Sequence, residues 1–124
     1  MALIKTSSKI SHPITHSIEK TSKSVNGTSF YGGYIYATGN EIAKICGEPN
    51  ILYDDKVTYE WELEVDGIPF TIYDYREISS PNMSTRLYYH VGAFNKDATK
   101  KILEAFKKYG FKTTTFDELI GRNN

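Results

Sequence analysis

The stretch KVTYEWELEVD, from Lys56 to Asp66, is apolar at every second position. Its apolar residues are Val57, Tyr59, Trp61, Leu63 and Val65. Successive side chains of a strand point to opposite faces, so an alternation with this period predicts a half-buried antiparallel strand. The strand decides the fold, because the residues that follow it also identify its partner.

Asp66-Gly67 comes directly after this strand and supplies the positive φ angles of a type I′ turn. The β-rich run that follows, IPFTIYDYRE, completes a hairpin whose register is fixed by the turn. The predicted pairs are Val65 with Ile68, Leu63 with Phe70, Trp61 with Ile72, Tyr59 with Asp74, and Val57 with Arg76. The outer face of the second strand is expected to carry Thr71, Tyr73 and Tyr75.

Two further strands and a helix are expected around the hairpin. The run SFYGGYIYAT at 29–38 predicts a strand with a bulge or a close backbone approach at Gly32-Gly33. Thr38 and Glu41 form a capping box for a short helix that Gly47 ends. In TRLYYHVGAF at 85–94, alternate apolar residues predict another strand, with Arg86, Tyr88 and His90 on its outer face.

The carboxyl-terminal part of the chain predicts two helices. Asn95 is placed to cap a helix with apolar residues at helical spacing that Gly110 terminates. Thr115 and Glu118 form a second capping box, which predicts a short last helix to about Ile120. The expected order is β-α-β-β-β-α-α, an α+β fold with an antiparallel sheet of about four strands and helices packed at its ends.

The length and composition predict one domain. Residues 1–24, rich in Ser and Thr, are expected to form a polar tail or a swapped arm, and residues 25–124 a single ligand-binding domain. The balanced charge and the lone Cys46 favour a reducing cytosol, and we expect neither a secretory signal nor a membrane span. Because the body is mildly acidic, we expect no DNA or RNA polymer as partner.

Aromatic and arginine residues are the strongest candidates for binding. The chain has 10 Tyr, and Tyr offers a flat face for stacking on nucleobases. Arg binds phosphate with a planar fork, and the chain uses this residue sparingly. The candidate ligand-binding residues on the strands are Tyr73, Tyr75, Arg76, Arg86, Tyr88 and His90. Asn95 is added for its helix amino terminus, and Arg122 as a mobile basic group.

Each of these residues also has a structural interpretation. Tyr has a high strand propensity, which alone can place it on half-exposed strands. Arg76 can form an ion pair with Asp74 or Glu77, and His90 can be a hydrogen-bonded structural histidine. Both interpretations remain open on the sequence alone.

Residues for catalysis or metal binding are poorly supported. Pro13 lies between His12 and His16 and opposes the helix that a zinc site there would need. Cys46 is expected to be a small core residue. The outer row of Glu60, Glu62 and Glu64 is interpreted as a solvated face and as protection of a sheet edge, although a pair of them could do acid-base work. We therefore expect no catalytic residue, no metal and no cofactor.

The blocks KVTYEWELEVDGIPFTIYDYRE and YYHVGAFNKDA resemble small bacteriophage proteins of the anti-Thoeris type, which are sponge proteins that sequester cyclic ADP-ribose signals. The resemblance covers roughly Tyr34 to Tyr109. It implies a protein of the host bacterial cytoplasm that binds glycocyclic ADP-ribose tightly without cleaving it. It also implies an intertwined homodimer or a hexamer, with pockets between protomers, and binding of CBASS cyclic oligonucleotides by some members.

Two other functions are kept as alternatives to a sponge. A small phosphodiesterase acting on the same cyclic nucleotides would use His90 and a strand carboxylate as acid and base. A structural or regulatory module would use the aromatic strands for self-association alone.

Overall fold

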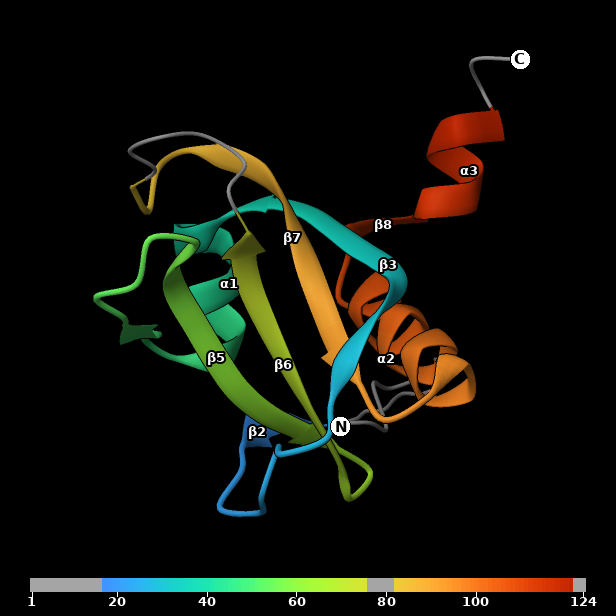
Figure 1. The fold of residues 1–124 in the computed structure, drawn as a ribbon, viewed down its shortest axis with the longest axis horizontal. Coiled ribbons are helices and arrows are strands. Elements are labelled where there is room, and N and C mark those ends of the chain that lie inside the picture. Colours follow the sequence, from blue (N-terminus) through green and yellow to red (C-terminus); the bar gives the residue numbers. More distant parts are fainter. Residues whose placement is uncertain (1–16, 76–81, 122–124) are drawn as a thin grey trace, which may run out of the picture.

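The structure is a computed structural model, and it describes residues 17–75 and 82–121. Seven strands in these residues form one antiparallel sheet in the order β2-β5-β6-β7-β3-β8, and β4 also pairs with β5 (Figure 1). The fold is therefore α+β, as expected, but the sheet has more strands than the four predicted. The strands are β2 (Ile18–Lys20), β3 (Ser29–Thr38), β4 (Asn50–Ile51), β5 (Val57–Val65), β6 (Ile68–Tyr75), β7 (Arg86–Ala93) and β8 (Lys112–Thr115).

The β5–β6 hairpin has the predicted register next to its turn. Val65 pairs with Ile68, and the pairs Leu63–Phe70 and Trp61–Ile72 follow along the two strands. Asp66 adopts a φ of 53° in the turn, as a type I′ turn requires. The alternate apolar residues of β5 face the core, which confirms the prediction from the alternating pattern.

The register shifts at the far end of the hairpin. Val57 pairs with Tyr75 and not with Arg76 as predicted, because an irregularity lies between Val57 and Glu60. The buried Asp74 explains the shift: its Oδ1 accepts hydrogen bonds from the backbone N–H groups of Thr58, at 2.9 Å, and Tyr59, at 2.7 Å. Two adjacent donors that turn toward one side chain cannot both pair with the neighbouring strand.

Of the segment 1–24 expected as a tail or swapped arm, residues 1–16 lie outside the described residues, and residues 17–24 contain a strand of the sheet. β2 pairs with β5, and Ile18 of β2, opposite Val65, is buried in the core. Together β2 and β4 cover the side of β5 that does not pair with β6. β5 is therefore an inner strand, so the interpretation of its glutamates as protection of a sheet edge was wrong.

Two helices pack on one face of the sheet. They are α1 (Gly39–Cys46) and α2 (Lys96–Lys108), and their buried residues join those of the strands in a single core. Ile42 of α1 and Ile102 and Phe106 of α2 are fully buried. The indole Nε1 of Trp61 donates to the Gly47 carbonyl at 2.7 Å, which fixes the end of α1 to the sheet.

Capping and glycine positions were predicted correctly. The Thr38 side chain accepts from Glu41 N while Glu41 accepts from Thr38 N, and Asn95 caps α2 by accepting from Ala98 N. In the β3 bulge Gly32 has a φ of 90°, and a Cβ at Gly33 would lie 2.6 Å from Thr99 of α2. Both predicted roles of the glycine pair, a bulge and a close approach, are therefore present.

The carboxyl-terminal elements differ in part from expectation. β8 pairs with β3 at the end of the sheet and was not predicted. The second capping box is present, since Thr115 and Glu118 exchange hydrogen bonds at 3.1 Å. It begins α3 (Phe116–Gly121), which projects from the body beside β8 (Figure 1).

Candidate functional site

The face of the sheet opposite α1 and α2 carries a continuous group of rings, here called the aromatic face. Its members come from three adjacent strands: Phe30, Tyr34 and Tyr36 of β3, Tyr73 and Tyr75 of β6, and Tyr88 and His90 of β7. Their side chains gather because alternate residues of paired strands lie side by side on one face. Tyr73, Tyr75, Tyr88 and His90, predicted as site residues, are all part of this face.

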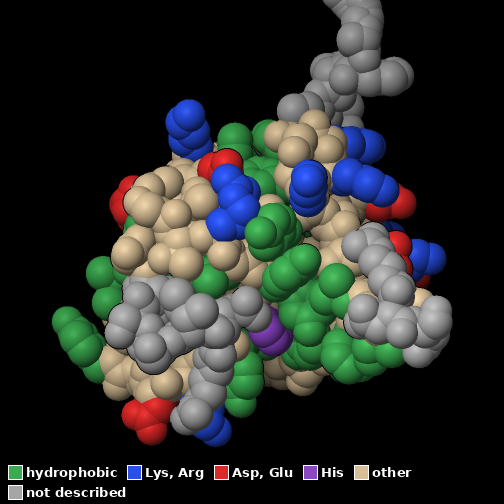
Figure 2. Space-filling view, turned by 90° about the horizontal axis from the view of Figure 1, so that it is seen from above, with side chains coloured by type: hydrophobic (Ala, Val, Ile, Leu, Met, Phe, Trp, Pro, Cys, Tyr) green, Lys and Arg blue, Asp and Glu red, His purple; other side chains and the backbone are tan. Residues whose placement is uncertain are grey.

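His90 lies at the centre of the aromatic face. Its ring centroid is 4.5 Å from that of Phe30, 5.1 Å from Tyr34, 5.4 Å from Tyr73 and 5.5 Å from Tyr75. In Figure 2 the purple histidine lies beside green hydrophobic side chains. Burial lowers the pKa of His90, against an opposing effect of the Tyr88 backbone, so the ring is neutral at pH 7. His90 thus offers an anion no positive charge.

Acidic side chains border the aromatic face on the β5 side. Glu60 pairs across the strands with Tyr73, and burial raises the pKa of Glu60, with Glu62 adding to the effect. The pKa of Tyr73 is also raised, first by burial and then by Glu60. Among the described residues no carboxylate forms an ion pair with His90. The β5 side is unfavourable for an anionic ligand.

Basic side chains border the aromatic face on its other side. Two adjoining pockets of about 440 Å³ each share Tyr36, Phe111 and Lys112 as lining residues. We call them together the cationic groove. Its further basic residues are Lys44 and Arg86 in one pocket and Lys107 in the other. Figure 2 shows Lys and Arg side chains gathered beside hydrophobic ones on this side of the molecule.

Tyr36 and Tyr88 connect the aromatic face to the cationic groove. Their ring centroids are 4.5 Å apart, and both residues line the pocket that contains Lys107. Each tyrosine is half-buried, so one side of the pair remains open to a ligand. A flat ring system can stack here while its anionic groups reach Lys112, which lines both pockets.

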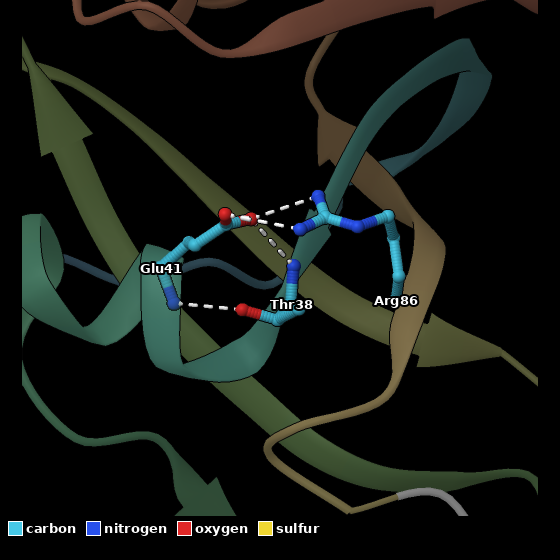
Figure 3. Close-up of polar contacts among 3 residues, drawn as sticks. All are labelled: Thr38, Glu41 and Arg86. Carbon is cyan, nitrogen blue, oxygen red and sulfur yellow. Dashed lines mark hydrogen bonds and ion pairs between the residues drawn. The ribbon is translucent and has the colours of Figure 1, made fainter.

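Arg86 is held by Glu41 (Figure 3). Arg86 Nη1 lies 3.0 Å from Glu41 Oε1 and Nη2 lies 3.1 Å from Oε2, and the guanidinium lies 5.7 Å from the Tyr36 ring centroid. The hydrogen bond from Arg86 is the main reason that the pKa of Glu41 is lowered. Sequence analysis considered an ion pair for Arg76 only. An anion in the groove must compete with Glu41 or use other donors of Arg86.

The remaining predicted site residues do not join the groove. Asn95 caps the amino terminus of α2, whereas Lys107 and the groove lie at the other end of this helix, roughly 20 Å away by helix rise. Arg76 and Arg122 lie outside the described residues. The structure therefore places Arg86 in one pocket of the groove and Tyr88 in the other, each together with Tyr36 and Lys112, which sequence analysis did not select.

The missed residues differ in how visible they were in the sequence. The alternation in SFYGGYIYAT places Tyr34 and Tyr36 on one face, so Tyr36 could have been found. Lys112 lies in β8, where the KTTT run of β-branched residues was the available signal. Lys44 and Lys107 are exposed helix lysines, and no local pattern distinguishes them from other solvated lysines.

Other chemistry finds little support in the described residues. No group of three or more His, Cys, Asp or Glu side chains within them could hold a metal ion. Cys46 is buried, and burial raises the pKa of its thiol to about 12, which agrees with a core residue and opposes a thiolate nucleophile. No helix in the described ranges is long and apolar enough to cross a membrane.

Comparison with protein-family models, with curated proteins and with solved structures gives no match to this chain.

Proposed function

We propose that this protein binds an anionic, ring-bearing nucleotide of the cyclic ADP-ribose type and holds it without cleaving it. The observation that carries the proposal is the Tyr36–Tyr88 ring pair, 4.5 Å between centroids, beside a groove lined by Lys44, Arg86 and Lys112. Stacking on tyrosine contributes roughly 1 to 3 kcal/mol per base, and Lys and Arg provide charge for a pyrophosphate. The acidic row on β5 directs the anionic part of the ligand toward the groove.

The biological role follows from the resemblance of the hairpin and β7 sequences to anti-Thoeris sponges. The protein then acts in the host bacterial cytoplasm, sequesters glycocyclic ADP-ribose and thereby blocks Thoeris defence, with CBASS cyclic oligonucleotides as further ligands. Depletion of a micromolar signal needs a dissociation constant near or below the nanomolar range, about 12 kcal/mol of binding. Such affinity favours an enclosed ligand. The proposal therefore includes a homodimer or hexamer in which a second protomer closes the groove.

Isothermal titration calorimetry with cyclic ADP-ribose isomers tests the proposal. We expect Tyr88→Ala to weaken binding about tenfold or more, because it removes one ring of the stacking pair. Arg86→Ala should weaken binding as well, since it removes one cation and leaves Glu41 unpaired in the groove. Both variants should keep the oligomeric state of the wild type. Lys101→Ala, on α2 but outside the groove, is the matched control and should bind like the wild type.

The state of the released nucleotide separates a sponge from an enzyme. The protein is incubated with the nucleotide and then denatured by heat, and the supernatant is analysed by mass spectrometry. Intact cyclic nucleotide supports sequestration, whereas a linear product would show that the protein hydrolyses the nucleotide. Unchanged calorimetric affinity in both Tyr88→Ala and Arg86→Ala would remove the groove as the binding site.

A further inference from the structure

The end of the aromatic face toward β5 differs in charge from the end toward the cationic groove. Glu60 lies directly opposite Tyr73 in the β5–β6 pair, and residues directly opposite each other share a face of the sheet. Glu62 lies two residues further along the same strand, so two carboxylates border this end. His90, which packs against Tyr73 and Tyr75, has a pKa that burial lowers and adds no positive charge.

Glu60 is a half-buried carboxylate, and it forms no ion pair within the described part of the chain. Burial raises the pKa of Glu60, and the neighbouring Glu62 raises it further. Both effects mean that the charged form lacks compensation. An approaching cation would stabilise this carboxylate, because it offsets the lost hydration and the repulsion from Glu62.

Two tyrosine rings beside Glu60 are arranged as a corner. The ring centroids of Tyr73 and Tyr75 are 6.5 Å apart, and the ring planes are at 85° to each other. One compact group in the corner can face both rings at roughly 4.6 Å from each centroid, inside the range of about 6 Å over which cation–π attraction acts. Tyr75 is 42% exposed and Tyr73 is half-buried, so a ligand can reach these rings.

The geometry and the charge together favour one class of cation. A flat cationic ring could stack on only one of two perpendicular rings, whereas a tetrahedral ammonium group presents atoms to both. A primary ammonium is compact but strongly hydrated, so it loses more hydration free energy when it leaves water. A quaternary ammonium carries its charge within apolar methyl groups, and clusters of aromatic rings are its usual binding site in proteins.

We infer that Tyr73, Tyr75 and Glu60 form a second binding site, for a ligand that carries a trimethylammonium group. The two rings contact the methyl groups, and the carboxylate of Glu60 provides the opposite charge. His90 supports the site by packing against both tyrosine rings, at 5.4 and 5.5 Å between centroids. The site goes beyond the proposed function, because the proposed nucleotide lies in the groove, at the other end of the aromatic face.

Choline and its neutral carbon analogue test the site. In the analogue a tert-butyl group replaces trimethylammonium, so the two molecules have nearly the same shape and differ in charge. Each is titrated into the full chain without nucleotide, and the tyrosine ring signals are followed by NMR. We expect choline to bind about tenfold more tightly than the analogue. Because no nucleotide is present, the result is independent of the proposed function.

Variants separate the rings from the charge. Tyr75→Leu removes an exposed ring and should weaken choline binding about fivefold, whereas Tyr75→Phe keeps the ring and should bind like the wild type. Glu60→Gln keeps the size of the side chain and should weaken choline binding several-fold without changing the affinity for the neutral analogue. Glu104→Gln, exposed on α2 across the sheet, is the matched control for overall charge and should bind normally.

Equal affinity of the wild type for choline and the neutral analogue would overturn the inference. Choline binding that neither Tyr75→Leu nor Glu60→Gln weakens would overturn it too. So would a wild type that binds no choline, and binding by Arg76→Ala would then show that the chain's own guanidinium is the occupant. Arg76 follows Tyr75 in the sequence and lies outside the described residues. Circular dichroism melting checks that each variant is folded.

Discussion

A single buried carboxylate resets the register of the central hairpin. Asp74 is 3% exposed and accepts two backbone hydrogen bonds, from Thr58 and Tyr59. The alternating pattern correctly placed Asp74 in the core-facing row, but the pattern contains no information about which donors a buried side chain will take. Register next to the Asp66-Gly67 turn was predictable because the turn sets it locally. Beyond Trp61 the register depends on a contact across strands.

Removing the carboxylate should destabilise the fold. Asp74→Ala leaves the N–H groups of Thr58 and Tyr59 without an acceptor, and we expect a loss of about 2–4 kcal/mol in the free energy of unfolding. Asp74→Asn keeps an oxygen that can accept both bonds and should lose much less. Urea denaturation followed by circular dichroism measures both variants. Equal losses of stability in Asp74→Ala and Asp74→Asn would show that these two hydrogen bonds do not stabilise the irregularity between Val57 and Glu60.

The stability difference between the wild type and Asp74→Asn should also depend on pH. Burial raises the pKa of Asp74 above its ordinary value, against the lowering effect of its backbone hydrogen bonds. The folded protein therefore binds this proton more tightly than the unfolded chain, and the associated stability is lost as the pH rises through the folded-state pKa. Because asparagine does not titrate, the stability of Asp74→Asn relative to the wild type should increase from about pH 4 to neutral pH.

At the scale of elements, Glu41 connects the start of α1 to β3 and β7. Its carboxylate accepts from Thr38 N at 3.0 Å and from both Nη atoms of Arg86. Glu41 thus stabilises the helix and also holds a cation of the groove. These two roles can be separated, because glutamine at N3 completes a capping box without the charge.

Glu41→Gln should therefore increase the affinity of the groove for an anionic nucleotide. We expect a dissociation constant several-fold lower than that of the wild type, since Arg86 no longer shares its charge with a carboxylate. Glu48→Gln removes one negative charge outside the groove and is the matched control for overall charge. Calorimetry at two salt concentrations measures the effect. A weaker affinity in Glu41→Gln would mean that Glu41 orients Arg86 for the ligand.

The elements that sequence analysis predicted share one property, which is a local signal. Capping boxes, turn dipeptides and long alternating runs act within a few residues, and they located α1, α2, α3, β3 and the hairpin. The missed strands β2, β4 and β8 have two to four residues each. Strands this short are stabilised by the neighbour they pair with, so their own sequence gives a weak pattern.

At the scale of the molecule, the aromatic face was more predictable than the groove. Alternation within β6 and β7 indicates which rings share a face, and the pairing of neighbours follows. The groove instead requires Lys112 of β8, Lys44 of α1 and Lys107 of α2 to meet, and these residues are far apart in the sequence. Only the whole arrangement of the chain brings their charges beside Tyr36 and Tyr88.

Truncation tests where the folded body begins. Deleting residues 1–24 removes β2, including the buried Ile18 and the hydrogen bond from Thr21 to Glu64 at 2.6 Å. Compared with a chain that lacks only 1–16, this protein should lose about 2–5 kcal/mol in the free energy of unfolding. Thermal melting of the two truncated proteins measures the difference. Identical melting temperatures would show that β2 is dispensable.

The position of the single tryptophan gives the molecule a natural optical probe. Trp61 is fully buried on the helix-covered face and bonded to the end of α1, while the aromatic face lies across the sheet. Its fluorescence emission will shift to longer wavelength when α1 separates from the sheet and water reaches the indole. A nucleotide stacked on the tyrosines cannot touch that ring. Tryptophan emission therefore reports the integrity of the helix layer, and tyrosine quenching reports occupancy, in one cuvette.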